Sequence, residues 1–476
     1  MNRKNTLLLR ATLTAIIAAV LVWQVTTRSL VAYLANSDPE AALTLRSSDP
    51  SALLVLAERT LAHIQQREQL PAGSPSQTQD RTQTSQEPQN GVRQWAQPAF
   101  KAADHQPRES ETLPHAADPS QSGAQASDQV RSLVEVALAN DPLNARGLSL
   151  MGQLAHMAGD EAAVAKFLGA AASRSLHESA AVYWVMQKSY DDRDYATALY
   201  CADALLRTNS QVSEYVMPVL LGIAESTQGT NDLKSAVLNN PPWRSSFLTA
   251  YAQYASDPRA SLELLLATRE TPTPPTTIDL SNYLNALIRR KQYELAYYAW
   301  LQFLPPEQLS STGLLFNGSF EIAPTGLPFD WVISEGTGVT IDIVPRPDRD
   351  GQRALLIEFG YGRVEFRGIE QLTAIPPGTY EFKAKYKGDI LGKRGLVWRV
   401  ACVDAPSPPI GESPMVTGAS TSWQEIKFSF IVPDRNCGVQ HVRLHFDTRM
   451  SSEQLISGSI LYDELSIARV KEMDRP

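Results

Sequence analysis

The spacing of hydrophobic and polar positions changes along the chain and divides it into three parts. An uncharged run with a mostly aliphatic centre lies near the N-terminus, at residues 11–27. Apolar residues then recur at helical spacing, with one interruption, as far as residue 303. From residue 313 onward they alternate with polar residues, which is typical of half-buried strands. The pattern therefore predicts a membrane helix, an array of helices and a C-terminal β-domain.

The N-terminal run predicts a membrane anchor. Residues 11–27 carry no charged side chain, and a spanning helix needs about 17–25 predominantly apolar residues. Arg3 and Arg10 precede the run, so the positive-inside rule places the N-terminus in the cytoplasm. We expect residues 1–35 to be a cytoplasmic stub and single-pass transmembrane anchor in a bacterial inner membrane, with the bulk of the chain periplasmic. A cleaved signal peptide, for which bulky Tyr33 makes a poor cleavage site, and a buried core helix are the alternatives.

The next two segments differ in composition. Asp38 and Asp49 each precede a proline, which is the arrangement of a capping residue before the first position of a helix. Residues 36–70 are therefore predicted to form a helical hairpin. Residues 71–127 are rich in Gln, Ser, Thr and Pro and contain few aliphatic side chains. Such a segment buries too little apolar surface to offset its ordering entropy, so we expect a disordered linker.

Residues 128–312 return to helical spacing and contain a degenerate repeat. Gly159-Asp160 and Arg193-Asp194, each at a predicted turn between two helices, are separated by about 34 residues, the tetratricopeptide period. The segment resembles tetratricopeptide repeats, whose stacked hairpins form an α-solenoid with a groove. The resemblance implies a protein partner in that groove. A helical spacer with no partner is the alternative.

Residues 313–470 are predicted to form an antiparallel β-sandwich, with residues 471–476 as a tail. Charged and apolar side chains alternate in four segments, 358–375, 379–387, 423–432 and 440–447. Runs of period two bounded by Gly, Pro and Asn predict antiparallel strands. Roughly eight or nine such strands are typical of a sandwich, and most often of a jelly roll.

Short motifs stand in order across this β-domain: FNGSFE at 316–321, Trp331, PPGTY at 376–380, FIVP at 430–433 and YDEL at 462–465. In order and spacing they resemble those of carbohydrate-binding modules with the galactose-binding-like jelly roll. The resemblance implies a polysaccharide ligand and a structural Ca²⁺ bound by Glu321 and Asp463. Because Ca²⁺ takes about 6–8 oxygen ligands, backbone carbonyls would have to complete the site. Ordinary solvated strand ends are the alternative.

The polar strand faces are the candidate ligand surface. Aromatic residues such as Tyr380 and Phe382 share parity with apolar residues, so we expect them in the core. The opposite faces carry basic and imidazole side chains, and arginine is a bidentate donor to the carboxylates of an anionic glycan. A plain solvated sheet face is the alternative. The candidate residues are Arg363, Arg367, Lys383, Lys385, Arg399, His441 and Arg443, with His445 on the face of His441.

The number of cysteines and the net charge argue against some classes of protein. With 3 cysteines and no CxxC pair, neither a disulfide-dense scaffold nor a thiolate zinc site is expected. Cys402 and Cys437 could pair outside the cytoplasm if their Cα atoms lie within about 7 Å, and two unpaired buried thiols are the alternative. The formal charge of −8 argues against non-specific nucleic-acid binding.

No catalytic signature is present: the chain lacks GxSxG, HExxH and GxxxxGK[ST]. We therefore expect a binding protein that requires no cofactor other than the implied Ca²⁺. The expected function is that of a membrane-anchored extracytoplasmic adaptor, in which helical repeats bind a protein and a jelly roll binds a cell-surface polysaccharide. Exopolysaccharide or envelope assembly is the natural setting by domain analogy. A scaffold that binds no sugar and a divergent glycan-active enzyme are the alternatives.

Overall fold

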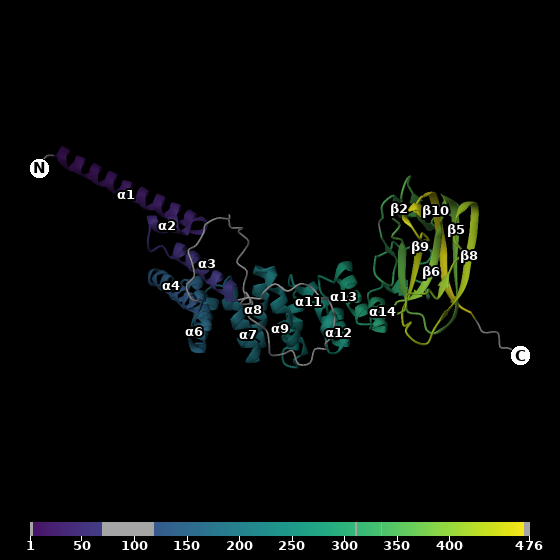
Figure 1. Cartoon of the computed structure of the whole chain (residues 1–476), viewed down its shortest axis with the longest axis horizontal. Coiled ribbons are helices and arrows are strands. Elements are labelled where there is room, and N and C mark those ends of the chain that lie inside the picture. Colours follow the sequence, from purple (N-terminus) through teal and green to yellow (C-terminus); the bar gives the residue numbers. More distant parts are fainter. Residues whose placement is uncertain (1–2, 69–118, 310–311, 335, 471–476) are drawn as a thin grey trace. The chain divides into compact units, whose positions relative to one another are not determined.

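The computed structural model describes residues 3–68, 119–309, 312–334 and 336–470 (Figure 1). The chain divides into two compact units, Met1–Leu233 and Lys234–Pro476. The first unit is helical, and the second combines further helices with two antiparallel sheets. Most of the predicted linker 71–127 and the whole predicted tail 471–476 lie outside the described residues.

The helices follow one another with short connections wherever consecutive ones are described. They are α1 (Arg3–Ser37), α2 (Pro39–Leu45), α3 (Pro50–Glu68), α4 (Pro119–Asn140), α5 (Ala145–Met157), α6 (Glu161–Arg174), α7 (Ser179–Asp191), α8 (Tyr195–Thr208), α9 (Ser213–Glu225), α10 (Thr230–Leu238), α11 (Arg244–Tyr254), α12 (Pro258–Arg269), α13 (Thr277–Arg289), α14 (Tyr293–Gln302) and α15 (Pro306–Leu309). Helix α4 begins at Pro119, inside the segment predicted as a linker. Its apolar side chains pack on α3, and this packing is a tertiary contact that composition does not reveal.

Helix α1 is long and apolar enough to cross a membrane, by length and composition, over Ile16–Ser37. Its apolar side chains from Ile16 to Leu30 are exposed, whereas Val31 and Ala35 are each only 2% exposed. These two residues form a core with Ala42 of α2 and Ala52 of α3. Helix α1 therefore runs without a break from its apolar segment into the packed helices.

The predicted helix caps and turns lie where the sequence places them. Asp38 accepts a hydrogen bond from Ala41 N–H at 3.0 Å at the start of α2. Gly159 and Arg193 have positive φ angles of 72° and 63°, and the aspartate after each caps the following helix. The positive φ ends one helix so that the next can fold back against it. These hairpins exist, and their assembly into a tetratricopeptide-like solenoid stays a prediction.

The β-sandwich consists of two antiparallel sheets of five strands each. Its strands are β1 (Val332–Ile333), β2 (Val339–Pro345), β3 (Arg353–Phe359), β4 (Ile369–Thr373), β5 (Gly378–Gly392), β6 (Leu396–Cys402), β7 (Gly411–Glu412), β8 (Gly418–Val432), β9 (Gln440–Phe446) and β10 (Ile456–Arg469). We call β1-β4-β9-β6-β7 the first sheet and β2-β3-β10-β5-β8 the second sheet. Figure 1 shows these strands side by side in the C-terminal part of the chain.

The sandwich core follows the predicted alternation. Tyr380, Phe382 and Ala384 of β5 are buried, and Trp398 of β6 is fully buried among them. The alternating segment 358–375 spans two strands, because β3 ends at Phe359 and β4 begins at Ile369. The chain crosses from one sheet to the other between these strands, and a polar-apolar alternation cannot distinguish that crossing from a continuous strand.

Hydrogen bonds of buried side chains fix the stretch 312–331, which precedes β1, against the sandwich. Trp331 is fully buried, and its Nε1–H donates to the carbonyl of Asn317 at 2.9 Å. The buried Gln371 of β4 accepts from Phe316 N–H at 2.9 Å and donates to Phe316 O at 3.0 Å. The stretch has little regular structure of its own, so these bonds replace the strand ladder that would otherwise satisfy its backbone.

Helix α14 packs directly on the sandwich. The ring of Trp300 lies 5.1 Å from that of Phe316 and 5.8 Å from that of Phe329. Beside this cluster, Tyr293 donates to Asp404 at 2.9 Å and Lys291 forms an ion pair with the same carboxylate at 3.0 Å. The sandwich and its neighbouring helices therefore share buried aromatic surface.

Candidate functional site

Outward-facing side chains of β6 and β9 bring basic and imidazole groups together on the first sheet. In the antiparallel register Arg399 lies opposite Arg443, and Ala401 lies opposite His441. His445 follows two positions along β9, on the same face, because side chains alternate with period two. Three of the predicted ligand-binding residues, Arg399, His441 and Arg443, thus meet in one place.

This face is hollowed beneath a loop. The hollow has a volume of about 310 Å³, at the lower end of the range of roughly 300–1,000 Å³ for ligand pockets. Its wall is the segment 403–409, which connects β6 to β7. The lining residues are Arg399, Ala401, Pro406, Ser407, Pro409, His441, Arg443 and His445.

Carboxylates balance the two arginines. Two like charges directly opposite each other on a sheet repel, but Arg399 pairs with Glu412 at 2.6 Å and with Asp447 at 3.0 Å. Glu370 of β4 lies 3.0 Å from His441 Nε2 and 3.4 Å from Arg443 Nε. Within the described chain this buried Nε makes no hydrogen bond. The face is therefore rich in hydrogen-bonding groups of both kinds and has little excess charge.

Two titratable groups of the face are shifted in pKa. Burial lowers the pKa of His445, and the nearby Arg399 and Arg443 lower it further, so the imidazole is neutral at pH 7. A neutral imidazole has one donor and one acceptor nitrogen. The hydrogen bond from His441 lowers the pKa of Glu370, which holds that carboxylate ionised. The hollow thus offers donors from arginine and an acceptor from imidazole, and carboxylates pair with its lining arginines.

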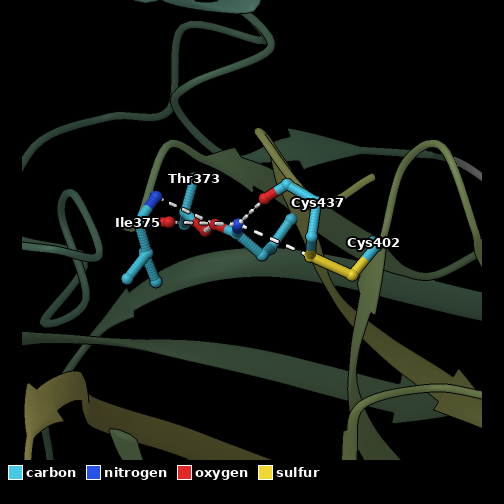
Figure 2. The surroundings of a disulfide bond; sticks show 5 residues. Thr373, Ile375, Cys402 and Cys437 are labelled. Carbon is cyan, nitrogen blue, oxygen red and sulfur yellow. Dashed lines mark hydrogen bonds between the residues drawn. A yellow bond between two sulfur atoms is a disulfide. The ribbon is translucent and has the colours of Figure 1, made fainter. Parts of the chain in front are cut away.

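A disulfide fixes the base of the wall. Cys402, at the end of β6, bonds to Cys437 with a Cα–Cα distance of 4.8 Å (Figure 2). This is one of the two states that the sequence left open for these cysteines. The buried Gln440 donates to Cys437 O at 2.6 Å and accepts from Ile375 N–H at 2.9 Å. The N-terminal end of segment 403–409 is therefore held in place by the disulfide and by the hydrogen bonds of Gln440.

The other predicted ligand-binding residues lie elsewhere. Lys383 and Lys385 are on β5 of the second sheet, where they pair with Glu381 at 2.9 Å and Glu464 at 2.6 Å. Period two tells which residues share a face of one strand, but it does not tell which sheet that strand joins.

Arg363 and Arg367 lie in the connection between β3 and β4. Arg363 bridges to Leu455 through its backbone. The carbonyl of Arg367 accepts from Arg443 Nη2 at 2.7 Å, so Arg367 borders the hollow through its backbone. Its side chain pairs instead with Glu365, at 3.0 Å.

The two carboxylates implied as Ca²⁺ ligands are already engaged. Asp463 accepts from Arg346 Nη1 at 2.6 Å in a buried ion pair, and Glu321 accepts from the backbone N–H of Arg353 at 3.2 Å. A Ca²⁺ ion needs about 6–8 oxygen ligands, and a guanidinium beside Asp463 repels a second cation. The donor set does not fit Ca²⁺. More widely, no cluster of three or more His, Cys, Asp or Glu suited to a metal occurs in the part of the chain that is described.

Sequence reasoning missed several residues of the hollow. Ala401 could have been predicted, because its outward parity on β6 can be read from the alternation, and the same holds for Glu370 of β4, which pairs with the lining residue Arg443. Pro406 and Pro409 could not have been predicted, because nothing in the sequence states that segment 403–409 covers the face of its own sheet.

The sequence matches no protein-family model and no curated protein. Among solved structures, it is similar to a structure described as "CBM4 structure and function", with 16% identity, a TM-score of 0.25 and coverage of 33% of this chain and 99% of the other. It is also similar to TmCBM61 in complex with β-1,4-galactotriose, with 16% identity, a TM-score of 0.24 and the same coverage of 33% and 99%.

A third similar structure is the CBM22-1 xylan-binding domain of Paenibacillus barcinonensis Xyn10C. It has 17% identity and a TM-score of 0.22, over 32% of this chain and 92% of the other.

Proposed function

We propose that the protein is a membrane-anchored extracytoplasmic adaptor whose β-sandwich binds a polysaccharide in the hollow of the first sheet. The observation that carries the proposal is the hollow itself, of about 310 Å³, in which side chains from β6 and β9 converge under segment 403–409. Arg399 and Arg443 line this hollow with guanidinium groups, which can donate hydrogen bonds to a ligand.

The balance of charge favours a hydroxyl-rich, uncharged chain over an anionic glycan. Arg399 and Arg443 already face Glu412, Asp447 and Glu370 at 2.6–3.4 Å. A polyanion would have to displace these carboxylates or approach them closely. Sugar hydroxyls, in contrast, both donate and accept, and arginine–carboxylate pairs and a neutral imidazole supply both partners.

One feature supports a location outside the cytoplasm, and a second supports a retained anchor. The disulfide between Cys402 and Cys437 is of a kind that persists in oxidising compartments. Helix α1 supplies Val31 and Ala35 to the core of α2 and α3, so cleavage after residue 35 would remove buried core residues. We therefore favour a retained anchor in a bacterial inner membrane, with the bulk of the chain in the periplasm.

The helical hairpins are the proposed binding surface for a protein partner. Stacked helix pairs expose one helix of each pair along a shared surface, and such surfaces commonly bind peptides or proteins. Each unit has an exposed aromatic side chain on its helices: Tyr200 of α8 in the first unit is 62% exposed, and Tyr254 of α11 in the second unit is 72% exposed. An adaptor with these two surfaces would connect a polysaccharide with a protein of the envelope assembly machinery.

The test is calorimetric titration of the full chain, purified in detergent, with polysaccharides extracted from the host. We expect saturable binding that Ala401→Phe weakens at least about tenfold, because a phenyl ring at this position fills the hollow. Ala419→Phe is the matched control, since Ala419 is an exposed alanine on β8 of the second sheet. Flat heats with every polysaccharide from a folded chain would leave a scaffold without sugar binding. Turnover of a polysaccharide would instead indicate a glycan-active enzyme.

A further inference from the structure

A buried arginine occupies the outer face of the second sheet. Arg346 directly follows β2, and its side chain is only 1% exposed. It pairs with Asp463 at 2.6 Å, with Asp348 at 2.7 Å and with Glu464 at 3.4 Å. Its guanidinium also lies 4.2 Å from the ring centre of Trp423.

These partners come from separate elements. Asp463 and Glu464 lie where the pairing of β10 with β5 shifts register, and Glu464 has a positive φ of 53°. Such a bulge brings neighbouring side chains to one face of a strand. Asp348 belongs to the turn between β2 and β3, and Trp423 lies on β8 at the opposite edge of the sheet. The guanidinium thus connects both edges of the second sheet with its central strand.

The members of this cluster hydrogen-bond to one another. Trp423 Nε1–H donates to Asp348 at 2.9 Å, and the same carboxylate accepts from two nitrogens of Arg346, at 3.1 Å and 2.7 Å. The guanidinium lowers the pKa of Asp348 to about 2, so this carboxylate stays ionised at any physiological pH. A buried charge is tolerated only when it is paired and hydrogen-bonded, and Arg346 meets both conditions.

We propose that the guanidinium of Arg346 performs the structural task that a divalent cation would otherwise perform at this end of β10, so that the sandwich is stable without metal. The ligand chemistry agrees with this role. Asp348, Asp463 and Glu464 are hard oxygen donors of the kind that bind Ca²⁺. They surround a permanent cation instead, and that cation belongs to the chain. Removing the guanidinium leaves Asp348 and Asp463 without the cation that they share, while Lys385 and Arg349 still pair with Glu464. An added divalent or trivalent cation should then offset part of the unbalanced negative charge.

The first test compares the thermal unfolding of the full chain in EDTA and in millimolar Ca²⁺. We expect no change in midpoint for the unaltered protein. Arg346→Ala lowers the midpoint of the sandwich by about 10 °C, because breaking a buried ion pair is strongly destabilising. Added Ca²⁺ then restores part of that loss. Arg349→Ala is the matched control, because Arg349 pairs with the same Glu464 at 3.2 Å but is half exposed. It should shift the midpoint little and give no response to Ca²⁺.

The second test uses Tb³⁺, which binds at Ca²⁺ sites and emits when a nearby indole transfers energy to it. Trp423 lies against the vacated position, so Arg346→Ala should give a several-fold gain in Tb³⁺ emission over the unaltered protein and over Arg349→Ala. If Arg346→Ala does not fold, Arg346→Lys keeps the charge and should still unfold independently of Ca²⁺. A midpoint of the unaltered protein that falls in EDTA and recovers with Ca²⁺ would overturn the proposal. So would a folded Arg346→Ala that is as stable as the unaltered protein or that gains no Tb³⁺ emission.

Discussion

Gln440 illustrates how one buried polar side chain sustains the candidate site. It is fully buried at the start of β9. Its amide nitrogen donates to Cys437 O at 2.6 Å and to Ile375 O at 3.2 Å, while its oxygen accepts from Ile375 N–H at 2.9 Å. Its four hydrogen-bonding positions are thus largely used by backbone groups that have no ladder partner of their own. The side chain connects the end of β4 with the disulfide.

We predict that Gln440→Leu, which is similar in size, destabilises this region by about 3 kcal/mol, because it leaves buried backbone groups unpaired. Hydrogen exchange of β4 and of segment 437–446 in the full chain would measure the local opening free energy. Gln424→Leu, on β8 of the second sheet, is the control and should leave that exchange unchanged. Equal protection in Gln440→Leu and the unaltered chain would contradict the assigned role.

His445 gives the face a defined pH dependence. Because its pKa in the folded chain lies below the ordinary value of 6.5, the unfolded chain binds a proton in a range where the folded chain does not. The free energy of unfolding around β9 should therefore fall as the pH falls through and below 6.5. His445→Asn should reduce this slope, and His63→Asn on α3 should not. Hydrogen exchange of β9 between pH 5 and 7, corrected for intrinsic rates, measures the effect; the same slope in both variants would contradict the assignment.

At the scale of elements, segment 403–409 links the hollow with the helices. Pro406 and Pro409 of this segment line the hollow, and its first residue directly follows the disulfide-bonded Cys402. Its Asp404 accepts a hydrogen bond from Tyr293 and forms an ion pair with Lys291. Burial, together with the hydrogen bond to Asp404, raises the pKa of Tyr293 to about 12, so this hydroxyl remains a donor. The position of the wall thus depends on contacts at both of its ends.

We predict that Tyr293→Phe increases hydrogen exchange in segment 403–409 and weakens polysaccharide binding by a few-fold, since one hydrogen bond to a charged group contributes about 1.5–3 kcal/mol. Tyr298→Phe is the control, because Tyr298 lies on the same helix and is half exposed. An unchanged exchange rate in Tyr293→Phe would show that the wall does not depend on this contact.

Helix α1 yields a prediction about packing. Ala35 is fitted between α2 and α3, so Ala35→Leu should overpack this core and destabilise it by about 1–3 kcal/mol. Ala19→Leu, on the exposed apolar stretch of the same helix, should have no such effect. Exchange protection of α2 and α3 reports the difference. Mass spectrometry of the chain recovered from membranes should also find residues 1–35 present, and their absence would contradict a retained anchor.

The sequence could predict the parts of this fold that depend on local spacing. Helix turns at Gly159 and Arg193, and the buried faces of Tyr380 and Phe382, follow from periodicity and from capping residues. Arg346 and Asp463 are separated by 117 positions, and no local pattern relates them. For the same reason, alternation placed Lys383 beside Arg443 although they lie on different sheets. Local patterns determine the face of a residue, whereas the sheet and the partner are tertiary facts.

At the scale of the whole molecule, the proposed roles fall on separate surfaces. The apolar segment of α1 suits a bilayer, the helical hairpins offer exposed aromatic residues, and the hollow lies on the first sheet of the sandwich. The second sheet carries the Arg346 cluster, which stabilises the sandwich on a different sheet from the one that forms the hollow. Because these sites use different residues, a protein partner and a polysaccharide would not compete for the same side chains.

The most direct measurement of the central claim is hydrogen exchange of the full chain with and without the polysaccharide that binds it. We predict added protection in β6, in segment 403–409 and in β9, with none in β5 or β8 of the second sheet. Ala401→Phe should abolish that protection, and Ala419→Phe should retain it. Protection that appears on the second sheet, or binding with no protection of β6 and β9, would contradict the placement of the site.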